Sequence, residues 1–395
     1  MRLQNWLRAV LTEDWRHGGF GLYIHWPFCE SKCPYCDFNS HVQAKVDQKQ
    51  WLSAYLSEID RYGRLLPKRF LDSVFFGGGT PSLMEPFLVD AVLERVQKTW
   101  PVANDLEVTL EANPSSVEAK RFSDFAKGGV NRISLGIQAL NDHDLKRLGR
   151  LHTASDAKKA FGIARSVFDR VSFDLIYARQ DQTLSSWETE LREALSMAVD
   201  HISLYQLTVE PGTAFWDRKA IGGLKGLPDE DLAADMFEVT QDICESMGLP
   251  AYEVSNHAKL GSESRHNVIY WRYGDYVGIG PGAHGRITVG TEKFATECWS
   301  QPYKWLSEVT KGTPEKKRYK LPVSEQSSES LMMGLRLTEG VDLNRLKALH
   351  CTPYSEAGLR ELLELELVET VGNHLRTTAK GRLMLNSVIR TLMPN

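Results

Sequence analysis

Three cysteines packed into one short segment constrain this chain more than any other feature of its sequence. Cys29, Cys33 and Cys36 follow the spacing C-x3-C-x2-C. The residues just before them, 21–26, are rich in aromatic and β-branched side chains and predict a strand, so the thiols lie on a loop that leaves a strand end. Thiolates are soft ligands that select zinc, copper(I) or an iron–sulfur cluster. A cluster of four irons normally takes four protein thiolates, so three would leave one iron open to bind a small molecule.

Two other uses of these cysteines have less support. A structural zinc site would need His25 or His41 as its fourth ligand, and such sites usually combine two spaced ligand pairs, whereas no second pair follows here. A disulfide framework is weaker still, because the other cysteines are scattered and the N-terminal residues do not resemble a secretory signal. Those other cysteines are Cys244, Cys298 and Cys351. The zinc interpretation stays open at this point.

Length and composition indicate a soluble globular protein. The 395 residues predict two or three domains, and the 42% hydrophobic and 25% charged contents are ordinary for this class. The net charge of −4 gives no general attraction to nucleic acid. No apolar run approaches the ~20 residues of a membrane span, and clustered cysteines suit a reducing cytosol. We therefore expect a cytoplasmic protein that has no transmembrane segment and binds no nucleic acid.

Residues 1–19 form an N-terminal segment that is too short to fold alone. Its apolar side chains recur at helical spacing and predict an amphipathic helix that packs against the main domain. The alternative is a helix that docks on a partner or on a membrane surface, which would make the protein peripheral at the membrane. The apolar residues are Leu3, Trp6, Leu7, Val10 and Leu11.

Strands and helices alternate from residue 20 to about residue 255. Near-continuous apolar strands separated by helices predict a parallel sheet that is buried on both faces. The number of strand–helix units favours a partial (β/α)6 barrel of the TIM type, within a domain that spans residues 20–300. The predicted strands are 21–26, 73–76, 106–111, 132–137, 171–176 and 202–208.

Polar groups follow the ends of these strands, where a barrel of this kind binds its ligands. Gly77, Gly78 and Gly79 come directly after a strand, and glycines there let the backbone approach a ligand closely. A carboxylate inside an apolar strand, such as Asp174, needs a donor, because a buried charge without a partner is costly. The other polar groups at these ends are Thr80, Glu111, Gln138 and Arg150.

The order of these segments resembles the radical S-adenosylmethionine (SAM) superfamily, in the branch of the oxygen-independent coproporphyrinogen III oxidases. The segments that carry the resemblance are YIHWPFCESKCPYCDFNS, FFGGGTPS, LEANP, NRISLGIQAL, LGRLH and FDLIY. The resemblance implies one [4Fe–4S] cluster on Cys29, Cys33 and Cys36, with SAM on the open iron. The family usually continues FDLIY with Gly-Leu-Pro, whereas this chain has Ala178, Arg179 and Gln180. The implied SAM contacts are Tyr23, Tyr35, Gly78, Gly79, Thr80, Glu111, Gln138, Arg150 and Asp174.

The same branch contains oxidases and haem chaperones, and this sequence is closer to the second. The oxidases carry one more cysteine two positions after the third, where this chain has Phe38. The segment H-N-x-x-Y-W resembles the signature of the HemW type of haem chaperone, which implies that His266 ligates haem iron and that haem passes to acceptor proteins of respiration, some of them associated with membranes. His284 is a second candidate ligand. The implied haem residues are His266, Asn267, Tyr270 and Trp271.

The remaining residues, 301–395, predict a smaller α+β domain of winged-helix type, and the sequence changes character near residue 321. Helices are expected at 331–337 and 356–366, followed by a hairpin over 367–376 and a final helix. Because residues 324–395 hold eight Lys and Arg against nine Asp and Glu, this part offers no footprint for phosphates. We expect a lid or a surface for docking another protein.

Overall fold

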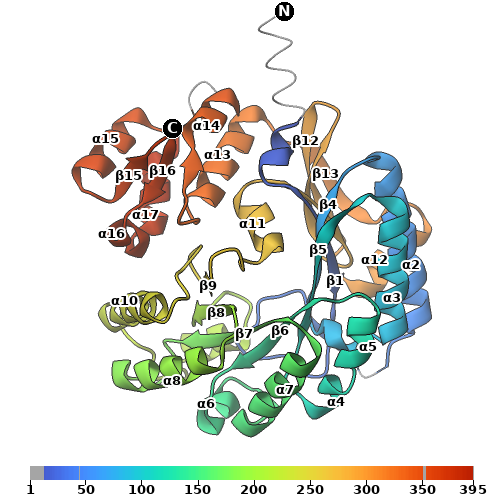
Figure 1. Cartoon of the computed structure of the whole chain (residues 1–395), viewed down its shortest axis with the longest axis horizontal. Coiled ribbons are helices and arrows are strands. Elements are labelled where there is room, and N and C mark those ends of the chain that lie inside the picture. The colour runs from blue at the N-terminus through green and yellow to red at the C-terminus, as the bar shows by residue number, and fades with distance from the viewer. Residues whose placement is uncertain (1–12, 44, 350–352, 395) are drawn as a thin grey trace, which may run out of the picture.

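The computed structural model describes residues 13–43, 45–349 and 353–394. Within these residues the main element is an eleven-stranded sheet, in which six parallel strands curve into a partial barrel with helices outside it (Figure 1). The α/β prediction with a partial (β/α)6 barrel is confirmed. The barrel strands, neighbours in this order, are β1 (Phe20–Trp26), β4 (Leu71–Gly78), β5 (Val102–Ala112), β6 (Arg132–Gln138), β7 (Arg170–Tyr177) and β8 (His201–Gln206).

The barrel strands are buried because helices cover their outer face. Leu22 and Ile24 of β1 and Val74 and Phe76 of β4 have no exposed surface, as expected of a parallel sheet covered on both faces. These side chains belong to one continuous core with the covering helices. Those helices are α2 (Gln48–Leu65), α3 (Pro86–Thr99), α4 (Ser116–Ala119), α5 (Phe122–Lys127), α6 (Asp142–Arg147), α7 (Ala154–Val167) and α8 (Leu184–Met197).

Further strands extend the sheet beyond both edges of the barrel. On one side β9 (Asn256–Ala258) pairs antiparallel with β8. On the other side β10 (Asp275–Ile279) pairs parallel with β1 and is followed by antiparallel β11 (His284–Val289), β12 (Glu292–Cys298) and β13 (Glu315–Lys320). The connecting helix α12 (Pro302–Thr310) packs on α2.

The first structural unit therefore extends past the predicted boundary at residue 300. Trp305 of α12 stacks on Trp51 of α2 with ring centroids 5.5 Å apart, and β13 is hydrogen-bonded to β12. We propose a domain boundary near residue 321, because the last strand of the large sheet ends at Lys320.

The C-terminal domain has its own core and contains the predicted hairpin and the helix predicted at 356–366, whereas the helix predicted at 331–337 begins at Val323 and ends at Gly334. A three-stranded sheet, in the order β14-β16-β15, packs with helices around side chains such as Leu346 and Leu375. The domain lies beside the barrel mouth, with α11 (Arg265–Trp271) between the two (Figure 1). Its elements are α13 (Val323–Gly334), β14 (Val341–Asp342), α14 (Leu343–Leu349), α15 (Glu356–Glu364), β15 (Val368–Val371), β16 (His374–Thr377), α16 (Ala379–Leu383) and α17 (Leu385–Leu392).

The N-terminal prediction lies mostly outside the described residues. Of the segment 1–19, the structure describes residue 13 onward and contains a short 3-10 helix, η1 (Asp14–His17). Asp14 pairs with Arg345 of the C-terminal domain at 2.7 Å, which ties this segment to α14. In the part of the chain that is described, no helix has both the length and the apolar character needed to cross a bilayer.

Candidate functional site

The three cysteines lie on a loop framed by two short strands. β2 (Phe28–Cys29) and β3 (His41–Val42) pair in parallel and hold the loop beyond the C-terminal end of β1. Cys29 is buried, whereas Cys33 and Cys36 are half-buried. Ligands collect at this end of the strands in barrels of parallel strands.

Each thiol has a polar neighbour. Thr80 Oγ1 donates to Cys29 Sγ at 3.4 Å, and Arg150 Nη1 donates to Cys33 Sγ at 3.3 Å. Cys36 Sγ lies 3.8 Å from Ser40 Oγ. Burial raises the pKa of the Cys29 and Cys36 thiols, whereas the neighbouring donors oppose this effect and favour the thiolate, which is the form that binds a metal. The predicted SAM residues Thr80 and Arg150 are therefore placed directly against the cysteines.

The backbone of the glycine turn packs tightly against Cys29. A Cβ atom at Gly79 would lie 3.0 Å from Cys29 Sγ and 2.7 Å from the Phe28 carbonyl oxygen. Gly78 has a φ of +114°, a conformation that favours glycine, and its N–H donates to Glu111 Oε2 at 3.2 Å. The turn is thus a cradle in which backbone approaches the cysteine loop closely.

The donor set fits a cluster better than a single metal ion. Among the described residues, no three His, Cys, Asp or Glu side chains are placed to hold one ion. In a cubane each thiolate binds a different iron, so the sulfurs surround the cluster and do not meet at one point. His25, a possible zinc ligand in the sequence, has both ring nitrogens occupied: Nδ1 lies 3.0 Å from Tyr23 Oη and Nε2 lies 2.9 Å from the Asn39 carbonyl. The zinc interpretation therefore has no geometric support.

A cavity of about 920 Å³ opens next to the cysteine loop, between the barrel mouth and the C-terminal domain. The cavity is lined on the barrel side by Tyr35, Cys36, Glu111, Gln138 and Asp174. Predicted site residues from the cysteine loop and from three strands thus meet at one space. This volume lies in the range of sites that enclose small molecules and cofactors.

Two half-buried carboxyl groups line this cavity. Burial, followed by the nearby charge of Asp174, raises the pKa of Glu111 to about 8. Burial raises the pKa of Asp174 to about 6, although Ser134 Oγ donates to its Oδ1 at 3.3 Å. Carboxyls in this state present both acceptors and an ionisable proton to a bound polar ligand.

The remaining predicted SAM residues lie around these carboxyl groups. Tyr23 is half-buried, and its ring stacks on Phe75 with centroids 6.2 Å apart. Gln138 has a φ of +74°, an uncommon backbone conformation for a residue with a side chain. Asn113, which the resemblance did not assign, donates to Thr80 Oγ1 at 3.2 Å and accepts from Arg150. Its position two residues after Glu111 at a strand end is the sequence signal that identifies it.

The departure after Asp174 has a structural compensation. Ala178 stands where the family has glycine and keeps a positive φ of +55°. Arg179 is buried and pairs with Asp144 and Glu190, while its Nη1 donates to the Ile176 carbonyl at 2.6 Å. The rim loop is therefore held by an ion-pair network in place of the family's Gly-Leu-Pro turn.

The structure places His266 in the core and not at the cavity. Its Nδ1 lies 2.7 Å from Ser73 Oγ, and its Nε2 lies 2.6 Å from Tyr270 Oη. The ring stacks on Phe75 at 5.0 Å, and burial lowers the pKa of His266 to about 3. Both ring nitrogens are thus engaged, so iron ligation requires a movement of α11 that separates His266 from Tyr270.

The other predicted haem residues lie near His266. Asn267 follows it in α11 and is half-buried, and Trp271 packs in a small apolar cluster with Tyr252 and Leu337. His284, the second candidate ligand, is exposed at the start of β11. The structure does not bring His284 together with His266 in any hydrogen bond or ring contact among the described residues.

Comparison with known proteins assigns the chain to a family. A model of the radical SAM superfamily matches residues 23–194, and a model of the HemN C-terminal domain matches residues 321–384. The chain is 40% identical to radical S-adenosyl methionine domain-containing protein 1, mitochondrial, of Mus musculus, over 94% of this chain and 87% of that protein. It is 35% identical to the heme chaperone HemW of Escherichia coli, over 94% of this chain and 97% of that protein.

A solved structure supports the fold. Coproporphyrinogen III oxidase (HemN) from Escherichia coli superposes with a TM-score of 0.80 over 98% of this chain and 92% of that chain, at 20% identity. The chain belongs to the radical SAM superfamily, in the family that also contains the heme chaperone HemW and radical S-adenosyl methionine domain-containing protein 1.

Proposed function

We propose that this protein is a haem chaperone, which binds haem and transfers it to acceptor proteins. The observation that carries the proposal is its 35% identity to a curated heme chaperone along almost the whole of both chains. The match covers 94% of this chain, so it extends over the barrel and the C-terminal domain. The acceptors expected for such a protein are haem-requiring proteins of respiration, which it would meet from the cytosol or at a membrane surface.

The residues around the cysteine loop fit a [4Fe–4S] cluster with SAM. Cys29, Cys33 and Cys36 would hold the cluster, and Gly79 lets the backbone of the turn approach Cys29 closely. A bound cluster would supply an open iron for the amino and carboxylate groups of SAM to chelate. Glu111 and Asp174 line the cavity and would accept hydrogen bonds from the bound ligand.

Coproporphyrinogen oxidation is the alternative activity. The likeness to HemN shows the fold, and the position of the oxidases' additional cysteine holds Phe38, which is 59% exposed and lines the cavity. A phenyl ring cannot replace a thiol as donor or ligand. Phe38 at this position therefore favours the haem-chaperone function over the oxidase activity.

One experiment separates these functions. The protein is purified anaerobically, titrated with haem while its absorption spectrum is recorded, and assayed separately for protoporphyrinogen formation from coproporphyrinogen. The proposal predicts a saturable haem spectrum and no decarboxylation. Decarboxylation without haem binding would establish the oxidase and reject the chaperone.

A further inference from the structure

Two arginines of the C-terminal domain line the cavity, and neither forms an ion pair with a described residue. Arg336 follows α13, and Arg382 lies in α16. Among the described residues neither guanidinium makes an ion pair or a hydrogen bond. Burial lowers the pKa of Arg382, and the nearest acid, Glu253, is already bonded to Asn256 and to the Ser255 N–H. Partly buried guanidinium groups are usually paired, so these two are available for an external acceptor.

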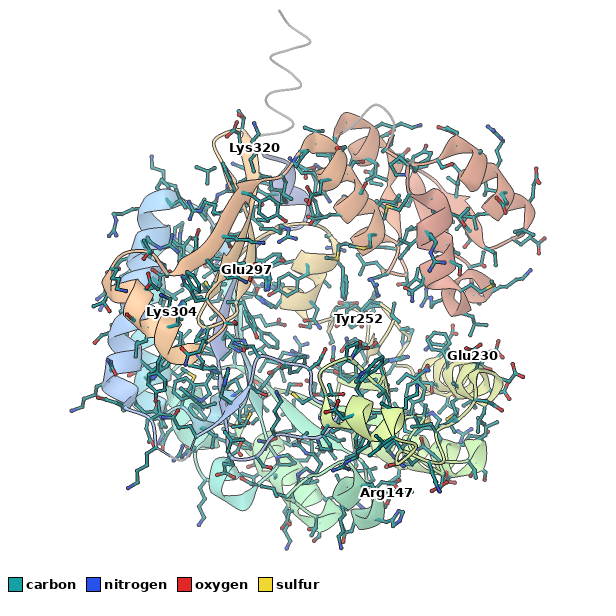
Figure 2. All side chains as sticks on the ribbon, turned by 180° about the vertical axis from the view of Figure 1, so that it is seen from behind. Arg147, Glu230, Tyr252, Glu297, Lys304 and Lys320 are labelled. Carbon is teal, nitrogen blue, oxygen red and sulfur yellow. The ribbon has the colours of Figure 1, made fainter. Side chains whose placement is uncertain are left out.

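The charges around the cavity are divided between its two sides. Of the described residues that line it, the cations are these two arginines, and both come from the C-terminal domain. The carboxyl groups come from the cysteine loop and the barrel side, where Figure 2 labels Glu230 at the start of α10 (Glu230–Ser246). The carboxyl groups are Asp37, Glu111, Asp174, Glu210, Asp229 and Glu230. A ligand with acidic groups at one edge would therefore be oriented with that edge toward the C-terminal domain.

The walls between these sides carry exposed apolar surface. Phe38, Tyr205 and Met384 are 59%, 41% and 49% exposed, and all three line the cavity. Exposed aromatic and methionine side chains gathered around one cavity mark a binding site for an apolar ligand. The cavity thus combines apolar side chains, carboxyl groups on its barrel side and two arginines on the side of the C-terminal domain.

One of these arginines contacts α11, the helix that contains the predicted haem signature. The guanidinium of Arg336 lies over the ring of Trp271, 5.5 Å from its centroid. Trp271 ends α11, the helix that carries His266. A ligand that draws Arg336 into the cavity would act directly on this cation–π contact.

We propose that Arg336 and Arg382 bind the two propionate carboxylates of haem, so that haem enters this cavity with its acidic edge toward the C-terminal domain and its apolar faces against Phe38, Tyr205 and Met384. This inference rests on the proposed haem-chaperone function and adds the site and the orientation. Bidentate pairing with carboxylates is the geometry that guanidinium groups favour.

The test uses haem and its dimethyl ester, in which both propionates are blocked. The full chain, purified anaerobically, is titrated with each compound, and the affinities are compared by absorption. Arg336→Met/Arg382→Met removes both charges, and Arg390→Met serves as the control because Arg390 is exposed on α17 and does not line the cavity. Iron content measured in each preparation reports whether the variants are folded.

The wild type and the control are expected to bind haem at least about tenfold more tightly than the ester, from charge-assisted hydrogen bonds. The double variant is expected to bind haem and ester alike. Wild-type protein that does not distinguish the two compounds overturns the inference, and so does a double variant that keeps the wild-type preference. A double variant that loses both compounds equally also overturns it, because the arginines would then support the cavity and not the carboxylates. Wild-type protein that binds neither compound contradicts the proposed function itself.

Discussion

Burial sets the protonation of single residues that line the cavity. The pKa of Glu111 rises from its ordinary value of 4.5 to about 8 because the carboxyl is desolvated and lies near Asp174. Between these two values the unfolded chain has released this proton and the folded chain keeps it. Since the folded state then binds more protons, stability falls as the pH rises through this window.

Glu111→Gln is therefore expected to stabilise the protein increasingly from pH 5 to pH 8. The amide keeps an acceptor for the Gly78 N–H and removes the ionisable group. The full effect of one proton is about 1.4 kcal/mol per pH unit. Thermal unfolding of the wild type and of Glu111→Gln at each pH measures this difference in stability. A difference in melting temperature that stays constant across these pH values would show that Glu111 titrates normally.

His266 provides a second prediction at this scale. Tyr270→Phe keeps the aromatic face and removes the hydroxyl that occupies His266 Nε2. If His266 ligates haem iron, this variant binds haem about fivefold more tightly, since one neutral hydrogen bond no longer competes. His266→Ala is expected to lose the absorption bands of histidine-ligated haem.

The control for this pair is Tyr319→Phe, which alters an exposed tyrosine on β13. It is expected to leave haem affinity unchanged. Weaker haem binding by Tyr270→Phe, or an unchanged spectrum in His266→Ala, would remove His266 from the site.

The glycine turn after β4 is the element on which the cysteine loop depends. Gly79→Ala places a Cβ atom 2.7 Å from the Phe28 carbonyl oxygen and 3.0 Å from Cys29 Sγ, so the loop must shift. We expect most of the bound iron to be lost, as measured in anaerobically purified protein.

Gly162→Ala is the matched control. Gly162 lies in α7, where a Cβ atom meets nothing within 4 Å. Alanine there is expected to leave the iron content unchanged and to raise stability by about 0.5–1 kcal/mol. Full iron content in Gly79→Ala would mean that the close approach of Gly79 to the cysteine loop is not needed for cluster binding.

The sequence predicts elements well where local pattern and burial agree. All six barrel strands were predictable from their apolar and β-branched residues, although β5 begins four residues before the predicted range. β13 was not predicted: its sequence, EKKRYK, has no apolar alternation, and it forms an exposed edge by pairing with β12. Because β13 was not predicted, the domain boundary predicted at residue 300 lies before the last strand of the large sheet.

Some residues of the candidate site were likewise predictable from the sequence, and others were not. Cys36 lies on the cysteine loop, and Glu111 and Asp174 lie in the C-terminal halves of their strands, so their convergence follows from the barrel alone. Arg336 and Arg382 reach the cavity through the packing of two domains, which no local pattern encodes. The buried position of His266 likewise depends on contacts with β4, far away in the sequence.

For the whole molecule, an ion pair at the domain interface fixes the C-terminal domain over the barrel mouth. Arg286 of β11 and Glu329 of α13 are 2.7 Å apart and only 20% and 15% exposed, and Tyr273 Oη donates to the same carboxylate at 2.8 Å. Glu329→Gln leaves the guanidinium without its charge partner and is expected to cost about 1–3 kcal/mol. Amide exchange in α13 and α14 should accelerate.

Glu339→Gln is the control, because its pair with Arg272 is 46% and 45% exposed. An exposed pair contributes ~1 kcal/mol or less, so exchange is expected to stay close to that of the wild type. Equal exchange rates in the two variants would mean that the buried pair does not hold the domain in place.

The iron and acid-labile sulfide content of anaerobically purified protein shows whether the three cysteines hold a cluster. We expect about four of each per chain in the wild type, and the same in Cys244→Ser, which changes a buried cysteine of the core. We expect neither in Cys29→Ser/Cys33→Ser/Cys36→Ser. Wild-type protein without iron and sulfide, or a triple variant that keeps both, would contradict the claim that these three thiolates hold a cluster at the mouth of the barrel.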